Sequence, residues 1–172
     1  HQTIFFTFTA WIKHWDCTKA GKIAAKASEG GTSDAGIIII DTSSDGSTAN
    51  GCGLRFYFIN PSAAQETTGA SSRLMSANTW YYVAVTFNNS NMSIYINGNM
   101  TNTTAATVAT IPTSGYNWSF GEREGAGSSG VWYYNGTLDD VRIFNRSLSS
   151  DQIVALFNNK TTLIVSQELR SP

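Results

Sequence analysis

Apolar and polar residues alternate with a period of two through much of the chain, a pattern typical of β-strands that bury one face. The sets that share an inward face are Phe6, Phe8, Ala10 and Ile12 in residues 3–13, Leu54, Phe56 and Phe58 in residues 54–59, and Tyr81, Val83, Val85 and Phe87 in residues 80–87. Further short strands are predicted at residues 22–26, 36–41, 92–97, 116–121 and 131–135, whereas residues 100–112 are rich in Thr and Ala and show no pattern. Many short strands separated by turn residues indicate an all-β, antiparallel two-sheet sandwich.

Residues 136–157 predict a strand, a tight corner and a short helix. Val141 and Ile143 are expected on the buried face of that strand. Ser149 is placed to cap the helix and Gln152, three residues later, completes a capping box. The helix, near residues 149–158, carries a narrow apolar stripe of Ile153, Leu156 and Phe157, so it must lie on another element.

Three segments in order carry a resemblance to a known family: residues 6–13, residues 80–98 and the GTLDDVRIFNRSLS stretch at residues 136–149. Together they resemble the laminin G-like domains of the concanavalin A-like lectin/glucanase superfamily, over about residues 5–158. The resemblance implies a jelly-roll domain over residues 1–160, with residues 161–172 as a final strand or a tether. Such domains usually carry another strand before residues 3–13, so either the chain is cut there or residues 163–167 fill the gap.

Composition narrows the range of partners and compartments. Charged residues make up 13% of the chain and the net charge is −1, which argues against binding to nucleic acid or to an anionic membrane. No apolar run is long enough to span a bilayer and no signal peptide is visible, so the chain is expected to be a mature or excised piece. Eight N-x-S/T sequons favour an extracellular, glycosylated surface, although Asn and Thr richness alone is the alternative: Asn88, Asn91, Asn99, Asn102, Asn117, Asn135, Asn145 and Asn159.

The two cysteines are candidates for a disulfide. If residues 22–26, 36–41 and 54–59 form a meander, Cys17 and Cys52 lie at the same end of one sheet. A disulfide also fits an extracellular chain. Two unrelated thiols are the alternative.

Calcium is the candidate cofactor. The resemblance implies a structural Ca²⁺ held partly by Asp139, which shares the parity of Val141 and is expected to point toward the interior edge. Backbone N–H groups would satisfy the same carboxylate. Asp41 and Asp45 have the oxygen spacing that begins a calcium loop, but the closing Glu is missing, so an ordinary Asp-Gly turn is the alternative.

Catalysis is another candidate function because glucanases share this architecture. They resemble one another in a strand with Glu-x-Asp-x-Glu, whereas Glu122 and Glu124 here lack the central Asp and the third carboxylate. His1 and His14 are too few for a triad, and no G-x-S-x-G motif occurs. The chain is therefore expected not to be an enzyme.

Aromatic residues are the remaining candidates for ligand contact, since sugar rings stack on aromatic planes. Tyr57, Tyr82 and Tyr95 fall on the outward parity of their strands, as do Trp11 and Trp80. A second group borders the Gly/Ser loop at residues 125–130 and consists of Trp118, Trp132, Tyr133 and Tyr134. Coverage of these faces by the helix and loops is the alternative.

These observations favour a non-catalytic extracellular binding or adhesion module with a glycan or glycoprotein as its partner. Recognition is expected in residues 41–53, 100–116 and 125–134, because ligand choice in this superfamily resides in rim loops. A structural or assembly domain without a small ligand, joined through its edge strands, is the alternative.

Overall fold

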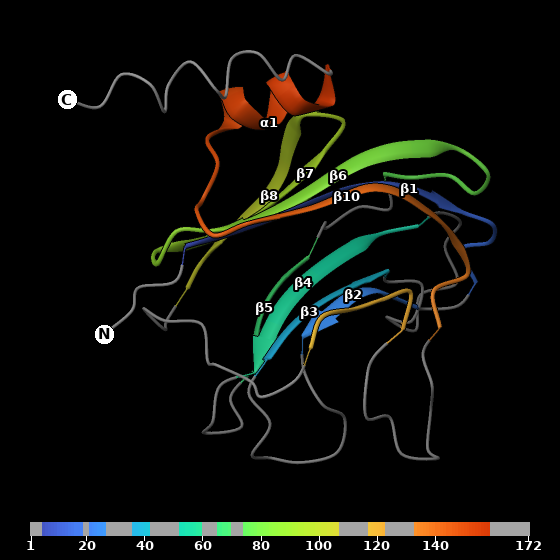
Figure 1. The fold of residues 1–172 in the computed structure, drawn as a ribbon, viewed down its shortest axis with the longest axis horizontal. Coiled ribbons are helices and arrows are strands. Elements are labelled where there is room, and N and C mark those ends of the chain that lie inside the picture. Colours follow the sequence, from blue (N-terminus) through green and yellow to red (C-terminus); the bar gives the residue numbers. More distant parts are fainter. Residues whose placement is uncertain are drawn as a thin grey trace.

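The computed structural model describes residues 5–18, 21–26, 36–41, 52–59, 65–69, 74–106, 117–122 and 133–158, and of residues 37–41, 59 and 65–69 the backbone alone. These residues form two antiparallel sheets, one above the other, with a helix on the outer side of the upper sheet (Figure 1). The sequence prediction of an all-β sandwich with one short helix is confirmed.

Within the described residues, each sheet has five strands. In spatial order, sheet A consists of β10 (Gly136–Phe144), β1 (Phe6–His14), β6 (Trp80–Phe87), β7 (Asn91–Ile96) and β8 (Asn99–Ala105). Sheet B consists of β5 (Gln65–Gly69), β4 (Leu54–Ile59), β3 (Gly36–Asp41), β2 (Lys22–Lys26) and β9 (Ser119–Phe120). The expected meander of residues 22–26, 36–41 and 54–59 is therefore present as β2, β3 and β4.

The core lies between the two sheets and is built from the inward sets that the sequence predicted. Its largest fully buried side chains include Phe8, Ile12, Phe56, Phe58 and Phe87. Phe58 of sheet B packs edge to face against Phe87 of sheet A, with ring centroids 5.3 Å apart. These aromatic contacts across the layers set the spacing of the sandwich.

Helix α1 (Ser150–Phe157) covers the outer face of sheet A. The predicted capping box is confirmed: the Ser149 hydroxyl accepts the Gln152 N–H, and the Gln152 side chain accepts the Ser149 N–H at 2.9 Å. Ile153 and Leu156 pack in a second apolar cluster on Tyr82, which β6 turns outward. Gly98, with φ +80°, lies at the β7–β8 turn, and a side chain there would come within 3.3 Å of the Phe157 ring.

Two strands were not predicted, and the strands expected at residues 116–121 and 131–135 are shorter in the part that the structure describes. β5 and β8 are sheet edges made mostly of Thr, Asn, Gln and Gly, so no alternation of apolar residues marks them. Of the strand expected at residues 131–135, the described part holds a single bridge between Tyr133 and Lys22.

β10 departs from the predicted parity because it contains a β-bulge. Asp140 adopts φ +47°, and the register with β1 shifts there, so that Trp11 pairs with Asp139 and Thr9 with Arg142. The extra residue moves Asp139 to the outer face of sheet A, where it is exposed. The expectation that Asp139 points toward the interior was wrong. Ile143 does pair with core-facing Phe8, but it is 40% exposed because β10 is an edge strand.

Candidate functional site

Three of the four residues predicted around the Gly/Ser loop lie along one edge of sheet B. We call Trp118, Phe120, Tyr133 and Tyr134 the aromatic edge. β9 places Phe120 opposite Ala24 of β2, and Tyr133 forms a bridge with Lys22 further along the same strand. The connection is continuous: the Gly121 N–H donates to the Ile23 carbonyl, and the Tyr134 N–H donates to the Gly121 carbonyl at 2.8 Å. Trp132 lies outside the described residues.

The rings at one end of the aromatic edge form a parallel stack that runs from the core to solvent. Phe6, which is buried, stacks on Trp118 with centroids 5.6 Å apart and ring planes 7° apart. Trp118 stacks in turn on Phe120 at 6.3 Å, again with planes 7° apart. Phe120 is 45% exposed, so the stack ends in an aromatic ring supported from behind and open to solvent.

Tyr133, at the other end of the aromatic edge, is 61% exposed, although its backbone is tightly held. Gly21 makes this possible: a side chain there would meet the Tyr133 carbonyl oxygen at 2.5 Å. At Gly136 a side chain would overlap the Lys13 carbonyl and come within 2.6 Å of the Tyr134 ring. The two glycines let residues 133–136 press against β1 and β2, which fixes where the exposed ring of Tyr133 stands.

Just after Tyr133, Asn135 is hydrogen-bonded to the segment that contains Trp15 and Asp16. The backbone N–H of Trp15 donates to the Asn135 carbonyl at 3.0 Å. The side-chain amide of Asn135 donates to Asp16 Oδ2 at 3.4 Å. Asn78 also donates its backbone N–H to the His14 carbonyl at 2.6 Å. Trp15 is 56% exposed. Trp15, Asp16 and Asn135 thus bring an exposed indole ring, a carboxylate and an amide into one hydrogen-bonded pair of segments, a combination that suits a polyhydroxylated ligand.

The disulfide lies at this same end of the sandwich, and the prediction of its pairing is confirmed. Cys17 and Cys52 are bonded, with their Cα atoms 4.9 Å apart. Cys52 also exchanges two backbone hydrogen bonds with Met75, at 2.8 and 3.2 Å. The segment after β1 is thereby tied to the start of β4.

The predicted row of aromatics on the outward sheet faces is covered except at Trp80, which is 39% exposed at the start of β6 with Lys13 Nζ 5.3 Å from its ring centroid. Tyr82 and Tyr95 are 2% and 5% exposed beneath α1, and Trp11 packs in the same cluster at 5.8 Å from the Phe157 ring. The alternative reading, coverage by the helix, is correct for these residues. Tyr57, on sheet B, is 5% exposed, with the Arg55 guanidinium 5.5 Å from its ring centroid. The geometry therefore favours the aromatic edge over the sheet faces as the ligand surface.

Two aromatic positions of this surface, Phe120 and Trp15, were not singled out from the sequence. Phe120 follows Trp118 by two residues, which in a strand places both rings on one side, so this signal was present. Trp15 directly follows the residues of β1, and no periodic pattern extends to it.

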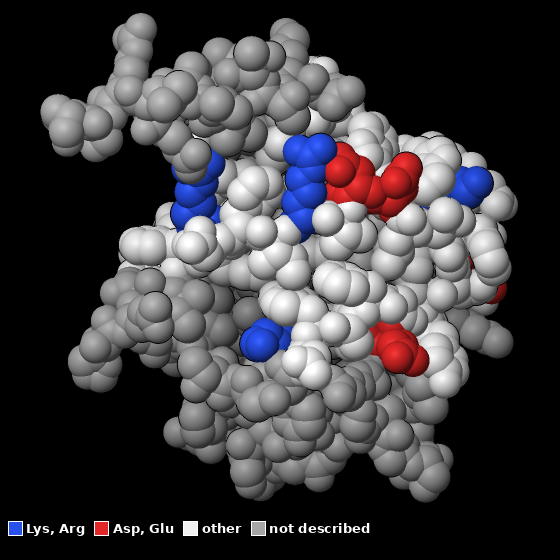
Figure 2. All heavy atoms as spheres, viewed as in Figure 1, with Lys and Arg blue, Asp and Glu red and all other residues white. Residues whose placement is uncertain are grey.

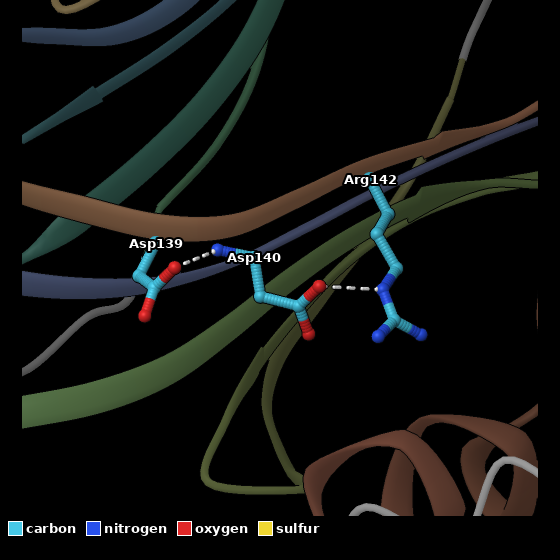
Figure 3. A network of polar contacts seen from close by, with 3 residues as sticks. All are labelled: Asp139, Asp140 and Arg142. Carbon is cyan, nitrogen blue, oxygen red and sulfur yellow. Dashed lines mark hydrogen bonds and ion pairs between the residues drawn. The ribbon is translucent and has the colours of Figure 1, made fainter.

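The residues predicted to bind calcium are not brought together. Asp139 Oδ1 accepts the Asp140 N–H at 2.8 Å, and Asp140 forms an ion pair with Arg142 at 2.8 Å, as Figure 3 shows. Asp41 is described by its backbone alone, and Asp45 lies outside the described residues. Among the described side chains there is no group of three or more His, Cys, Asp or Glu that could hold a metal ion. Calcium binding stays a prediction.

Charges give little further guidance to the site. Figure 2 shows one face of the molecule, on which the described surface is mostly uncharged and the Lys, Arg, Asp and Glu side chains are few. Glu122 is exposed just after β9, where its carbonyl accepts the Ser119 hydroxyl at 2.9 Å; Glu124 lies outside the described residues. No helix in the described part of the chain is long and apolar enough to cross a membrane.

The sequons differ in accessibility. The exposed ones are Asn88, Asn99, Asn117 and Asn145, and the half-buried ones are Asn91, Asn102 and Asn135. Asn159 lies outside the described residues. Glycosylation itself stays a prediction.

The family model described as the concanavalin A-like lectin/glucanases superfamily matches residues 2–154. No curated protein sequence matches the chain. Among solved structures, the sialidase CBM40 domain of Ruminococcus gnavus bound to α2,3-sialyllactose has a TM-score of 0.71 at 16% identity, over 90% of this chain and 83% of that one. A putative carbohydrate-binding protein of Bacteroides ovatus has a TM-score of 0.68 at 19% identity, over 88% and 40%. A heptameric SAP-like pentraxin from Limulus polyphemus has a TM-score of 0.63 at 18% identity, over 90% and 70%.

Proposed function

Because the chain belongs to the laminin G-like family of the concanavalin A-like lectin/glucanase superfamily, we propose that it is a non-catalytic binding domain that takes a glycan on its aromatic edge. The observation that carries this proposal is the pair of exposed rings, Phe120 and Tyr133, which both lie along the β2 edge of sheet B. A pyranose ring has an apolar C–H face that packs on such rings, while its hydroxyl groups need amide and carboxylate partners.

Carbohydrate as the ligand class is supported by two of the structural neighbours. One is described as a domain bound to α2,3-sialyllactose and another as a putative carbohydrate-binding protein. Their structural similarity supports the fold, but at such low sequence identity it does not by itself identify a ligand. The local chemistry supplies the rest of the argument, since Asp16 and Asn135 lie beside Trp15 at the end of the aromatic edge.

The preformed stack favours binding for an entropic reason. Phe120 is held from behind by Trp118, and Trp118 by Phe6, so the outer ring is already oriented before a ligand arrives. A ligand that packs on an ordered ring avoids the cost of immobilising a mobile side chain, about 0.5–1.5 kcal/mol for each one. We place this ligand binding outside the cell, with a glycan or glycoprotein as the partner. The disulfide and the sequons support an extracellular location.

A glycan array followed by titration calorimetry tests the proposal. The wild-type chain should bind at least one glycan, and Phe120→Ala and Tyr133→Ala should each weaken that binding roughly tenfold or more, about 1.4 kcal/mol. Leu74→Ala is the matched control, because Leu74 is 47% exposed and lies outside the aromatic edge. Failure to bind any glycan at millimolar concentration, or binding that survives both substitutions, would overturn it.

A further inference from the structure

The outer edge of β8 is an unoccupied pairing surface in the part of the chain that the structure describes. β8 ends sheet A and has β7 as its neighbour there. The Ala106 N–H donates to the Ser90 carbonyl at 2.8 Å, toward the β7 side. Because backbone directions alternate along a strand, Thr104 and Asn102 also point their N–H groups at β7, whereas Thr103 and Ala105 point theirs away. Thr103 and Ala105 are exposed.

Sheet edges that stay single are usually blocked by charge, proline or a bulge, and the two edges of sheet A differ in this respect. β10 carries Asp139, Asp140 and Arg142 together with the left-handed bulge at Asp140. The β7–β8 hairpin, residues 91–105, contains no charged residue and no proline. Its one irregularity lies at Thr101, which leaves residues 102–105 in regular register with β7. β8 therefore lacks the charged side chains that protect β10, and residues 102–105 hold no bulge.

Apolar surface lies next to this edge. Met100 of β8 is 54% exposed, and Val154 of α1 is 39% exposed. Both are close to the β7–β8 turn, since a side chain at Gly98 would lie 3.4 Å from a Val154 methyl group. A partner that paired with β8 would be positioned to cover Met100 and Val154 as well.

We propose that the occupant is a second copy of this chain, paired through β8 with β8 in antiparallel orientation about a two-fold axis. An isologous contact requires a self-complementary surface, and an uncharged strand of Thr, Asn and Ala meets that requirement without like-charge repulsion. With Thr104 on the two-fold axis, Thr103 of each copy faces Ala105 of the other, and the outward N–H and C=O groups of these residues satisfy each other. The two A sheets then become one continuous sheet.

The dimer leaves ligand surfaces free. In sheet A, β8 and β10 are opposite edges, and in the sheet below β5 contacts β8, whereas β9 ends the far side. Pairing through β8 therefore places the two aromatic edges at the outer ends of the assembly. The inference does not depend on the proposed function, because it is tested by mass and amide exchange without any glycan.

The test is sedimentation equilibrium over a wide range of protein concentration, with the chain made in a host that adds no N-glycans. The wild type should move from the mass of one chain to that of two as concentration rises. Ala105→Pro removes an outward N–H while leaving the bonds to β7, and it should hold the mass at one chain; Ala105→Ser keeps the N–H and should behave as wild type. A wild type that stays monomeric, or a dimer that Ala105→Pro does not affect, would overturn the inference.

Amide hydrogen exchange gives a second, site-specific readout. In the dimer the N–H groups of Thr103 and Ala105 become bonded, so their exchange should slow as protein concentration rises, while the exposed Leu74 amide should not change. A dimer in which Thr103 and Ala105 exchange as fast as in the monomer would place the contact elsewhere and contradict the pairing.

Discussion

Trp118 and Phe6 stack face to face across the open side of the sandwich, with centroids 5.6 Å apart and planes 7° apart. Phe6 belongs to β1 of sheet A, and Trp118 directly precedes β9 of sheet B, so this contact joins the two layers. We expect Trp118→Ala to lower the free energy of unfolding by about 2–3 kcal/mol, because it leaves a cavity against the core. Urea denaturation measures the loss.

Phe120→Ala is the comparison for that experiment. Its ring is 45% exposed, so removing it should cost less than about 1 kcal/mol of stability while still weakening ligand binding. Equal stability losses for the two variants would show that Trp118 does not join the layers as described.

The Cys17–Cys52 bond should stabilise the fold by restricting the unfolded chain. The two cysteines are 35 residues apart, which corresponds to about 3–4 kcal/mol in the chain-entropy model. Chemical denaturation with and without a reducing agent should show a loss of this size for the wild type. The double variant Cys17→Ser/Cys52→Ser should match the reduced wild type and be insensitive to the reducing agent; a response of that variant would point to another cause.

The capping box of α1 can be tested one side chain at a time. Ser149→Ala removes the acceptor for the Gln152 N–H and should cost about 1 kcal/mol in the free energy of unfolding. Ser149→Asp keeps an acceptor and should cost far less. Because α1 covers Tyr82 and Tyr95, near-ultraviolet circular dichroism should report any loosening of the helix. Identical stabilities for the Ala and Asp variants would contradict the cap.

Alkaline unfolding should depend on Tyr82. Burial raises the pKa of its hydroxyl above the usual value near 10; Asp140 adds to the rise, and Arg142 opposes it. The unfolded chain therefore loses the Tyr82 proton at lower pH than the folded chain does. This contribution to stability is complete below about pH 10 and is lost as the pH rises from there through the folded pKa.

Tyr82→Phe separates this effect from general alkaline damage. The fall in unfolding free energy between about pH 8 and about pH 11 should be smaller in Tyr82→Phe than in the wild type. Tyr133→Phe, at a side chain that is 61% exposed, should show the same fall as the wild type. Equal slopes for all three proteins would remove Tyr82 as the cause.

Sequon use should follow accessibility. The Asn135 amide is half-buried and donates to Asp16, so we expect it to stay unmodified in a glycosylating host. The exposed Asn88, Asn117 and Asn145, which lie outside β8, are expected to carry glycans. Peptide mass spectrometry gives the occupancy of each site. A glycan on Asn135 together with bare exposed sequons would contradict the prediction.

The sequence was sufficient where a local pattern determines the structure. The period-two pattern placed Phe8 and Val85 in the core, and the spacing of Ser149 and Gln152 predicted the helix cap. The meander of strands β2, β3 and β4 was enough to predict the disulfide. In each case the interactions that decide the outcome lie within a few residues or follow from strand order.

The sequence pattern gave wrong predictions where a single residue or a distant element determines the side or the burial of a side chain. The bulge at Asp140 reversed the side to which Asp139 points, and nothing in the alternation of residues 139–143 marks the extra residue. Tyr82 and Tyr95 have the parity of surface residues, and only the docking of α1 buries them. Three of the four residues of the aromatic edge were predicted, and Phe120 and Tyr133 come to the same sheet edge through their separate pairing with β2.

β1 lies between β6 and β10, and this order constrains how a nascent chain can fold. Among the described strands, β1 is the first to leave the ribosome, yet β10, one of its two neighbours, is the last. Until residues 136–144 leave the exit tunnel, Phe8 and Ile12 lack the backbone that closes their side of the sheet. The sandwich is therefore completed only after residues 136–144 have emerged, and long-range closure of this kind makes folding slow.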